Sequence, residues 1–260
     1  MMWYLKVYVQ GSKTAMATAM AYRSNFFISV FISIAGNMVA PFVTILIYGT
    51  GASIPGWLFY EALLIQSVFV MCNGVCAPIF SSLVWTTMGR IREGSYDLIM
   101  IKPGSVVFNT IAQSIDPDAI GILLGGIVMF SLSLAHLPPP SAFQWISFFF
   151  FFLMGTVVML GCTLIMGATI FKWVGNSRIF EMYNSIAGFG RYPSSIFPKG
   201  LNILITFILP VAMLGFIPAS ALLGNMNFMM FLSAFPCILF LLMGIWLYKR
   251  MIYAYQSAGG

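Results

Sequence analysis

Long stretches without charged side chains constrain this chain more than any other feature. Residues 25–48 carry no charge, and residues 57–85 carry only Glu61. A helix needs about 20 apolar residues to cross the hydrocarbon core of a bilayer. Composition agrees, because 60% of the residues are hydrophobic and 7% are charged, against about 25% charge in soluble domains. These runs predict an all-α polytopic membrane protein.

Four further segments bear on the number of spans. Residues 117–136 form the third apolar run. Asp116, Pro117 and Asp118 suit the start of its helix as N-cap, first helical residue and first-turn acid. Residues 143–171 and 228–248 are strongly apolar, and the latter run ends at Lys249 and Arg250. The fifth span is ambiguous, because residues 173–192 contain charges and residues 201–223 contain two prolines. Either choice gives six spans in one domain, residues 1–260.

Two segments have the pattern of surface helices. Residues 1–23 mix aromatic side chains with lysines and are too polar to span, so an interfacial helix is predicted. Residues 106–115 alternate apolar and polar positions at helical spacing, which predicts a second surface helix. Cations gather in the N-terminal segment, at residues 90–102, near Lys172 and at the C-terminus. The positive-inside rule therefore places these four regions, with both termini, in the cytoplasm.

Residues typical of catalytic, nucleotide or metal sites are sparse. Residues 11–14 (GSKT) lack the full G-x-x-x-x-G-K-[ST] phosphate loop. His136 is the single histidine, and the four cysteines sit within or beside apolar runs. Scattered cations do not form a nucleic-acid surface. We therefore expect no catalytic residue, no metal site and no cofactor bound by this chain.

Residues 86–103 form the most polar loop. A short charged helix at the cytoplasmic end of two spans can receive force from a soluble partner, whereas a solvated connector with positive-inside cations is the alternative. Residues 94–103 (GSYDLIMIKP) resemble a segment of ABC-2 type permeases of the six-span branch. Residues 191–198 (RYPSSIFP), then 204–212 (LITFILPVA), 217–219 (IPA) and 222–224 (LLG), resemble that family's later motifs in the same order.

The resemblance implies a fold like that of type V exporters and a role as the permease subunit of an ABC exporter. It implies a fifth span at residues 173–190 and a re-entrant segment at residues 199–224 on the external side. The loop at 86–103 would then hold a coupling helix that docks on the ATPase. The residues implied in coupling are Met88, Arg90, Arg92, Glu93, Tyr96 and Asp97. The prolines implied in the re-entrant segment are Pro193, Pro198, Pro210 and Pro218.

The same resemblance implies partners and a substrate class. The partners would be ABC ATPase subunits, which bind ATP and Mg²⁺, a second permease, identical or related, and membrane lipid. The substrate would be hydrophobic or amphipathic, such as a lipid, peptide or drug, exported across the bacterial plasma (inner) membrane. An ion-coupled secondary transporter and a membrane-embedded enzyme are the alternatives. Few ionisable residues lie within the spans, Arg178 and Glu181 being the exceptions, which weakens the ion-coupled alternative.

Overall fold

Helices make up all the regular structure in residues 2–173 and 177–255, the parts that the computed structural model describes. The prediction of an all-α protein is confirmed. The α-helices are α1 (Met2–Ala21), α2 (Arg23–Asn37), α3 (Val39–Gly49), α4 (Phe59–Cys76), α5 (Leu83–Arg92), α6 (Asp97–Met100), α7 (Val106–Ala112), α8 (Ile120–Leu134), α9 (Ala142–Ile170), α10 (Ser177–Ala187), α11 (Lys199–Ile203), α12 (Phe216–Leu222), α13 (Phe228–Leu232) and α14 (Ala234–Ile252). The short 3₁₀ and π elements are η1 (Ala77–Ser81), η2 (Pro117–Ala119), η3 (Gly188–Arg191), η4 (Ser194–Ile196), η5 (Leu204–Ile208) and η6 (Val211–Leu214).

Five helical stretches of the described chain are long and apolar enough to cross a membrane. They correspond to the predicted first, second, third, fourth and last spans. Their bounds are Arg23–Gly49, Phe59–Arg92, Pro117–Leu134, Ala142–Ile170 and Phe228–Ile252. The first is bent at Met38, between α2 and α3, and the second contains the π turn η1, which begins beside Pro78.

The fifth span at residues 173–190 stays a prediction, because part of it lies outside the described residues. Within residues 173–190 the described helix is α10, which has 11 residues. This helix continues directly into η3, so the described helical stretch covers residues 177–191. Residues 174–176 lie outside the described part of the chain. The competing segment, 201–223, is divided among four short elements, α11, η5, η6 and α12.

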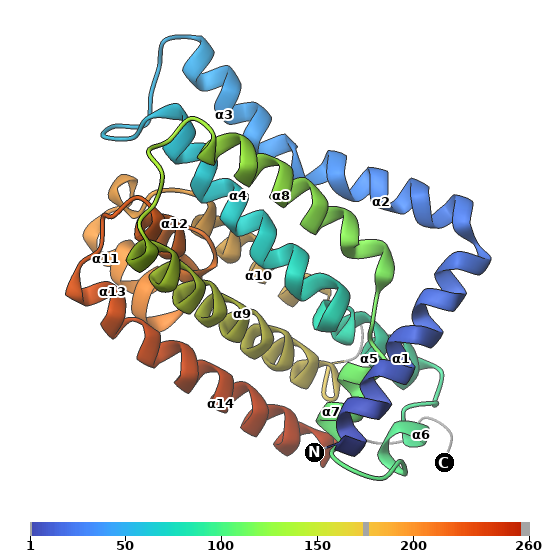
Figure 1. Ribbon diagram of the computed structural model, residues 1–260. Helices are drawn as coiled ribbons and strands as arrows, with labels where there is room; N and C mark the ends of the chain where they lie inside the picture. Colours follow the sequence, from blue (N-terminus) through green and yellow to red (C-terminus); the bar gives the residue numbers. More distant parts are fainter. Residues whose placement is uncertain (1, 174–176, 256–260) are drawn as a thin grey trace.

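The bundle is built around α4, whose residues 62–70 are all buried. Helix α4 packs on α8, and α9 packs on α14, with these four helices running side by side (Figure 1). Small residues allow the close approach: a side chain at Gly74 would collide with the backbone of Leu123 on α8, and one at Gly244 would meet the backbone of Gly161 on α9. Such contacts are typical of helices packed in membranes.

Residues 199–224 double back inside the bundle. The return limb, η6 and α12, is buried against α4 and α9. Just before the segment, Ser195 accepts a hydrogen bond from the Trp57 indole at 3.0 Å, and Gly224 at its end lies beside Gln144. Trp57 precedes α4 and Gln144 lies in the first turn of α9, so both flanks lie at the same end of the bundle. Whether the segment dips into a bilayer from outside stays a prediction.

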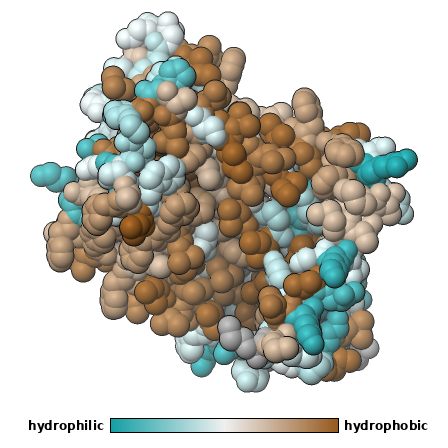
Figure 2. All heavy atoms as spheres, viewed as in Figure 1, coloured by the Kyte–Doolittle hydropathy of each residue, from teal (hydrophilic) through white to brown (hydrophobic). Residues whose placement is uncertain are grey.

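Apolar side chains cover much of the outer surface. Figure 2 shows hydrophobic residues across the middle of one face, with hydrophilic residues gathered toward the ends. Helices α2 and α3 lie at the edge of the bundle (Figure 1) and expose large side chains such as Phe27, Phe31 and Phe42. A surface of this kind suits contact with lipid or with another membrane subunit.

Candidate coupling and translocation site

One end of the bundle gathers the charged loop and the surface helices. The end of α5, the short helices α6 and α7, the start of α1 and the end of α14 meet there (Figure 1). We call residues 92–101, which connect α5 through α6, the coupling turn. At the opposite end lie the loops before α4 and α9 and the flanks of the doubled-back segment.

The coupling turn is closed by backbone hydrogen bonds. The carbonyl of Arg90 accepts from the backbone N–H of Ser95 at 2.8 Å and from that of Tyr96 at 3.2 Å. Gly94 between them has a φ of 67°, in the left-handed region that glycine adopts most readily. The chain therefore reverses sharply after α5 and begins α6 at Asp97.

Tyr96 anchors this turn to the bundle. Its side chain is 0% exposed, and its hydroxyl lies 3.2 Å from the Thr110 hydroxyl on α7 and 3.1 Å from the Tyr248 hydroxyl on α14. Tyr248 also lies 3.5 Å from the hydroxyl of Thr87 on α5. Burial, followed by the neighbouring Tyr248, raises the pKa of Tyr96, so its hydroxyl stays protonated as a hydrogen-bond donor. This hydroxyl cluster joins the turn to three helices.

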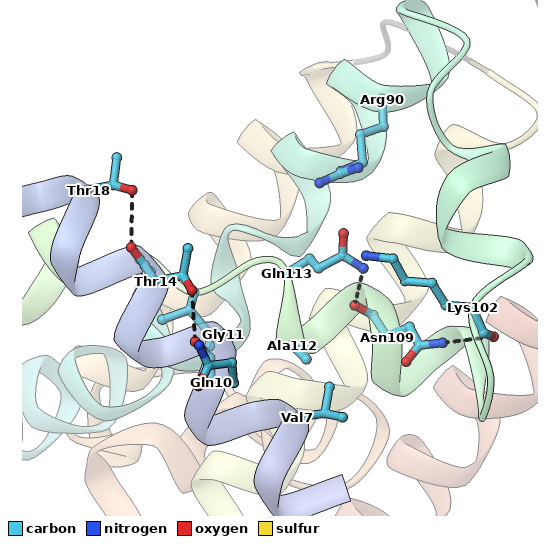
Figure 3. Close-up of a pocket in the computed structure, with 12 residues that line it drawn as sticks. Val7, Gln10, Gly11, Thr14, Thr18, Arg90, Lys102, Asn109, Ala112 and Gln113 are labelled. Atoms are coloured by element: carbon cyan, nitrogen blue, oxygen red, sulfur yellow. Dashed lines mark hydrogen bonds between the residues drawn. The ribbon is translucent and has the colours of Figure 1, made fainter. Parts of the chain in front are cut away.

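The predicted coupling residues divide between surface and interior. Arg92 and Glu93 are exposed, Asp97 is half-buried, and Met88 packs at the margin of the core around Tyr96. The half-buried Arg90 lies on α5 and lines a cavity bounded by α1 and α7 (Figure 3). Leu98 and Ile101, which the sequence did not single out, are exposed in the same turn as Arg92 and Glu93, Ile101 at 78%.

A second polar surface lies on α10. Arg178, Glu181 and Ser185, at helical spacing on one face, are all exposed, whereas Ala187 on the other face is buried. Tyr183 donates a hydrogen bond to the Met159 sulfur at 2.7 Å, near the middle of α9. The polar face of α10 is therefore close in depth to the middle of the bundle, where contact with hydrocarbon would be costly.

The four predicted prolines mark helix starts within residues 193–218. Pro193, Pro198 and Pro210 immediately precede η4, α11 and η6, and Pro218 lies in the first turn of α12. Proline is tolerated at such positions because the first N–H groups of a helix have no partner within it. The prolines thus divide the segment into short helices.

No group of three or more histidine, cysteine or acidic side chains that could hold a metal ion occurs in the described residues. The four cysteines, Cys72, Cys76, Cys162 and Cys237, are buried and free of disulfides.

These membrane-length helices, with a charged turn at one end and a doubled-back segment at the other, are those of a polytopic membrane protein. Residues 34–259 match the family described as ABC-2 family transporter protein, and the chain belongs to that family. Comparisons with curated proteins and with solved structures gave no match. The chain is therefore a membrane component of an ABC transporter, a family that implies association with an ABC ATPase.

Proposed function

We propose that the chain is the permease subunit of an ABC exporter and that its coupling turn docks on a separate ATPase subunit, which binds ATP and Mg²⁺. The observation that carries this proposal is the composition of the exposed turn. Arg92 and Glu93 alone would suit a solvated connector, but Leu98 and Ile101 expose apolar surface in the same turn. Apolar residues next to charged ones are typical of protein interfaces.

The buried base of the turn gives it a mechanical role. Because Tyr96 contacts Thr110 and Tyr248, a force on the turn reaches α7 and α14 directly. Closure of two ATPase subunits around ATP would move these helices as a rigid body. The movement would open a path between two permease subunits, which form a homodimer or a heterodimer.

The polar face of α10 supports placing that path beside α10. Arg178, Glu181 and Ser185 are too polar to face lipid at this depth, so we place them toward the second permease subunit or the substrate path. Met182 on the same exposed surface adds apolar contact. A wall of sparse polar groups among apolar ones suits a hydrophobic or amphipathic substrate, such as a lipid, a peptide or a drug.

Substitution in the coupling turn tests the proposal. Arg92→Glu with Ile101→Asp places an opposite charge and a new charge on the proposed interface without disturbing the buried Tyr96. We expect normal membrane insertion, because exposed substitutions usually change stability by no more than about 0.5 kcal/mol. Co-purification of the ATPase should fall by about tenfold or more, since one interface residue with a cost of about 1.4 kcal/mol suffices for that change.

The matched control is Lys199→Glu with Leu58→Asp, an exposed cation and an exposed apolar residue at the opposite end of the bundle, where α11 and α4 begin. This pair should leave ATPase co-purification unchanged. Equal ATPase recovery with the turn variant would show that residues 92–101 are a solvated connector. Transport that persists in permease freed of ATPase would point to an ion-coupled secondary transporter.

A further inference from the structure

A cavity of about 510 Å³ lies between the surface helix α1 and the elements that flank the coupling turn. Figure 3 shows α1 on one side and α5 and α7 on the other, with the Arg90 and Lys102 side chains reaching toward Gln113. The volume falls within the range of small-molecule binding sites. The residues of the coupling turn that are proposed to contact the ATPase do not line it.

The cavity is positively charged. Arg90 and Lys102 both line it, and its other lining residues, all in the described part of the chain, include no acidic side chain. Gln10 and Gln113 add side-chain amides, whereas the Thr14 hydroxyl donates to the Gln10 carbonyl at 3.0 Å. A guanidinium, an ammonium and amide N–H groups together are the donors that bind phosphate oxygens.

The walls of the cavity are joined by hydrogen bonds among residues that line it (Figure 3). Asn109, 3% exposed, donates through its side-chain amide to the carbonyls of Lys102 at 3.4 Å and Pro103 at 3.3 Å. Gln113 donates to the Asn109 carbonyl at 3.1 Å. A side chain at Gly11 would collide with the backbone of Ala112, so α1 and α7 are in close contact beside the cavity. These contacts fix the backbone of the cavity wall, and the half-buried Arg90 and the exposed Lys102 both line the space that it encloses.

Helix α1 connects this space to a membrane surface. It exposes apolar Leu5, Val9 and Met16 together with Lys6 and Lys13. A helix with this composition lies at the level of the lipid headgroups, where cations attract anionic lipid. The cavity between α1 and α7 is thus placed where a headgroup can enter and acyl chains can remain outside.

We propose that this cavity binds the phosphate of an anionic phospholipid headgroup, with Arg90 and Lys102 as its charged contacts. The bound lipid bridges α1 to the segment that follows the coupling turn. This site is distinct from the substrate path along α10, and it makes the stability of the permease depend on lipid charge.

Thermal unfolding of the full chain in nanodiscs tests the site. The lipid is phosphatidylcholine alone or phosphatidylcholine with phosphatidylglycerol, and the variant is Arg90→Gln with Lys102→Gln. We expect phosphatidylglycerol to raise the unfolding temperature of the wild type and not that of the variant, and native mass spectrometry to show about tenfold weaker retention of this lipid. In phosphatidylcholine alone the two proteins should unfold alike, which establishes that the variant folds.

The control, Lys249→Gln with Arg250→Gln, removes the same charge at the end of α14, away from the cavity. It should respond to phosphatidylglycerol as the wild type does. An equal loss of response in both variants would show that the effect depends on net charge alone. That result would overturn the proposed lipid site. Inorganic phosphate added to phosphatidylcholine nanodiscs should protect the wild type poorly; protection as strong as that of phosphatidylglycerol would show a site for free phosphate and overturn the assignment to lipid.

Discussion

The Tyr96 hydroxyl ties the coupling turn to α7 and α14 through two buried contacts. In Tyr96→Phe the Thr110 and Tyr248 hydroxyls each lose one of their hydrogen-bond partners, and at about 0.5–1.5 kcal/mol per hydrogen bond the two together contribute about 1–3 kcal/mol. We expect the free energy of unfolding in detergent micelles to fall by that amount. The control Tyr253→Phe, at a side chain 89% exposed, should change it by less than about 0.5 kcal/mol. Equal effects would show that the cluster does not hold the turn.

For the coupling turn, the sequence predicted which segment is polar but not which of its side chains point outward. Arg90, Arg92 and Tyr96 all occur in the polar loop, yet only Arg92 is exposed. The difference arises because Gly94 reverses the chain and turns Tyr96 inward against Tyr248, which is 152 residues away in sequence. A single sequence gives no signal for such a pairing. The sequence also did not predict that Ile101 is exposed, because an apolar residue in a polar loop is expected to be buried.

The exposure of the polar face of α10 can be tested by cysteine labelling. If its polar face lines a water-accessible path, Ser185→Cys should react with a membrane-impermeant thiol reagent in the assembled transporter. The control is Leu153→Cys on α9, which is 57% exposed on the apolar surface and should stay unlabelled. The natural cysteines are buried and give little background. Labelling of Leu153→Cys with no reaction at Ser185→Cys would contradict the placement.

Among the elements, the long apolar runs were the most predictable, because hydrocarbon demands about 20 apolar residues from each span. The five membrane-length stretches match the predicted runs. The region between α9 and α13 was not predictable from hydropathy, since α10 is short and has a polar face, and the strongly apolar residues 201–223 are broken by Pro210 and Pro218. Their burial against α4 and α9 depends on tertiary packing, which hydropathy does not report.

Across the whole molecule, the two ends of the bundle differ in structure, and the proposed function assigns ATPase binding to only one of them. The coupling turn and the cationic cavity lie at one end, and the flanks of the doubled-back segment lie at the other (Figure 1). The start of α1 and the end of α14 lie at the coupling end, as the distribution of cations predicts for the cytoplasmic side (Figure 1). The ATPase should therefore bind at that end alone.

Site-specific cross-linking measures this contact directly. A cysteine at the exposed Glu93 or Leu98 of the coupling turn, joined to a short cross-linker in the assembled transporter, should capture the ATPase. A cysteine at the exposed Asn225, at the opposite end, should not. Capture from both turn positions and none from position 225 is the result that we predict. Capture from position 225, with none from the turn of a complex that contains the ATPase, would contradict the assignment of residues 92–101 to coupling.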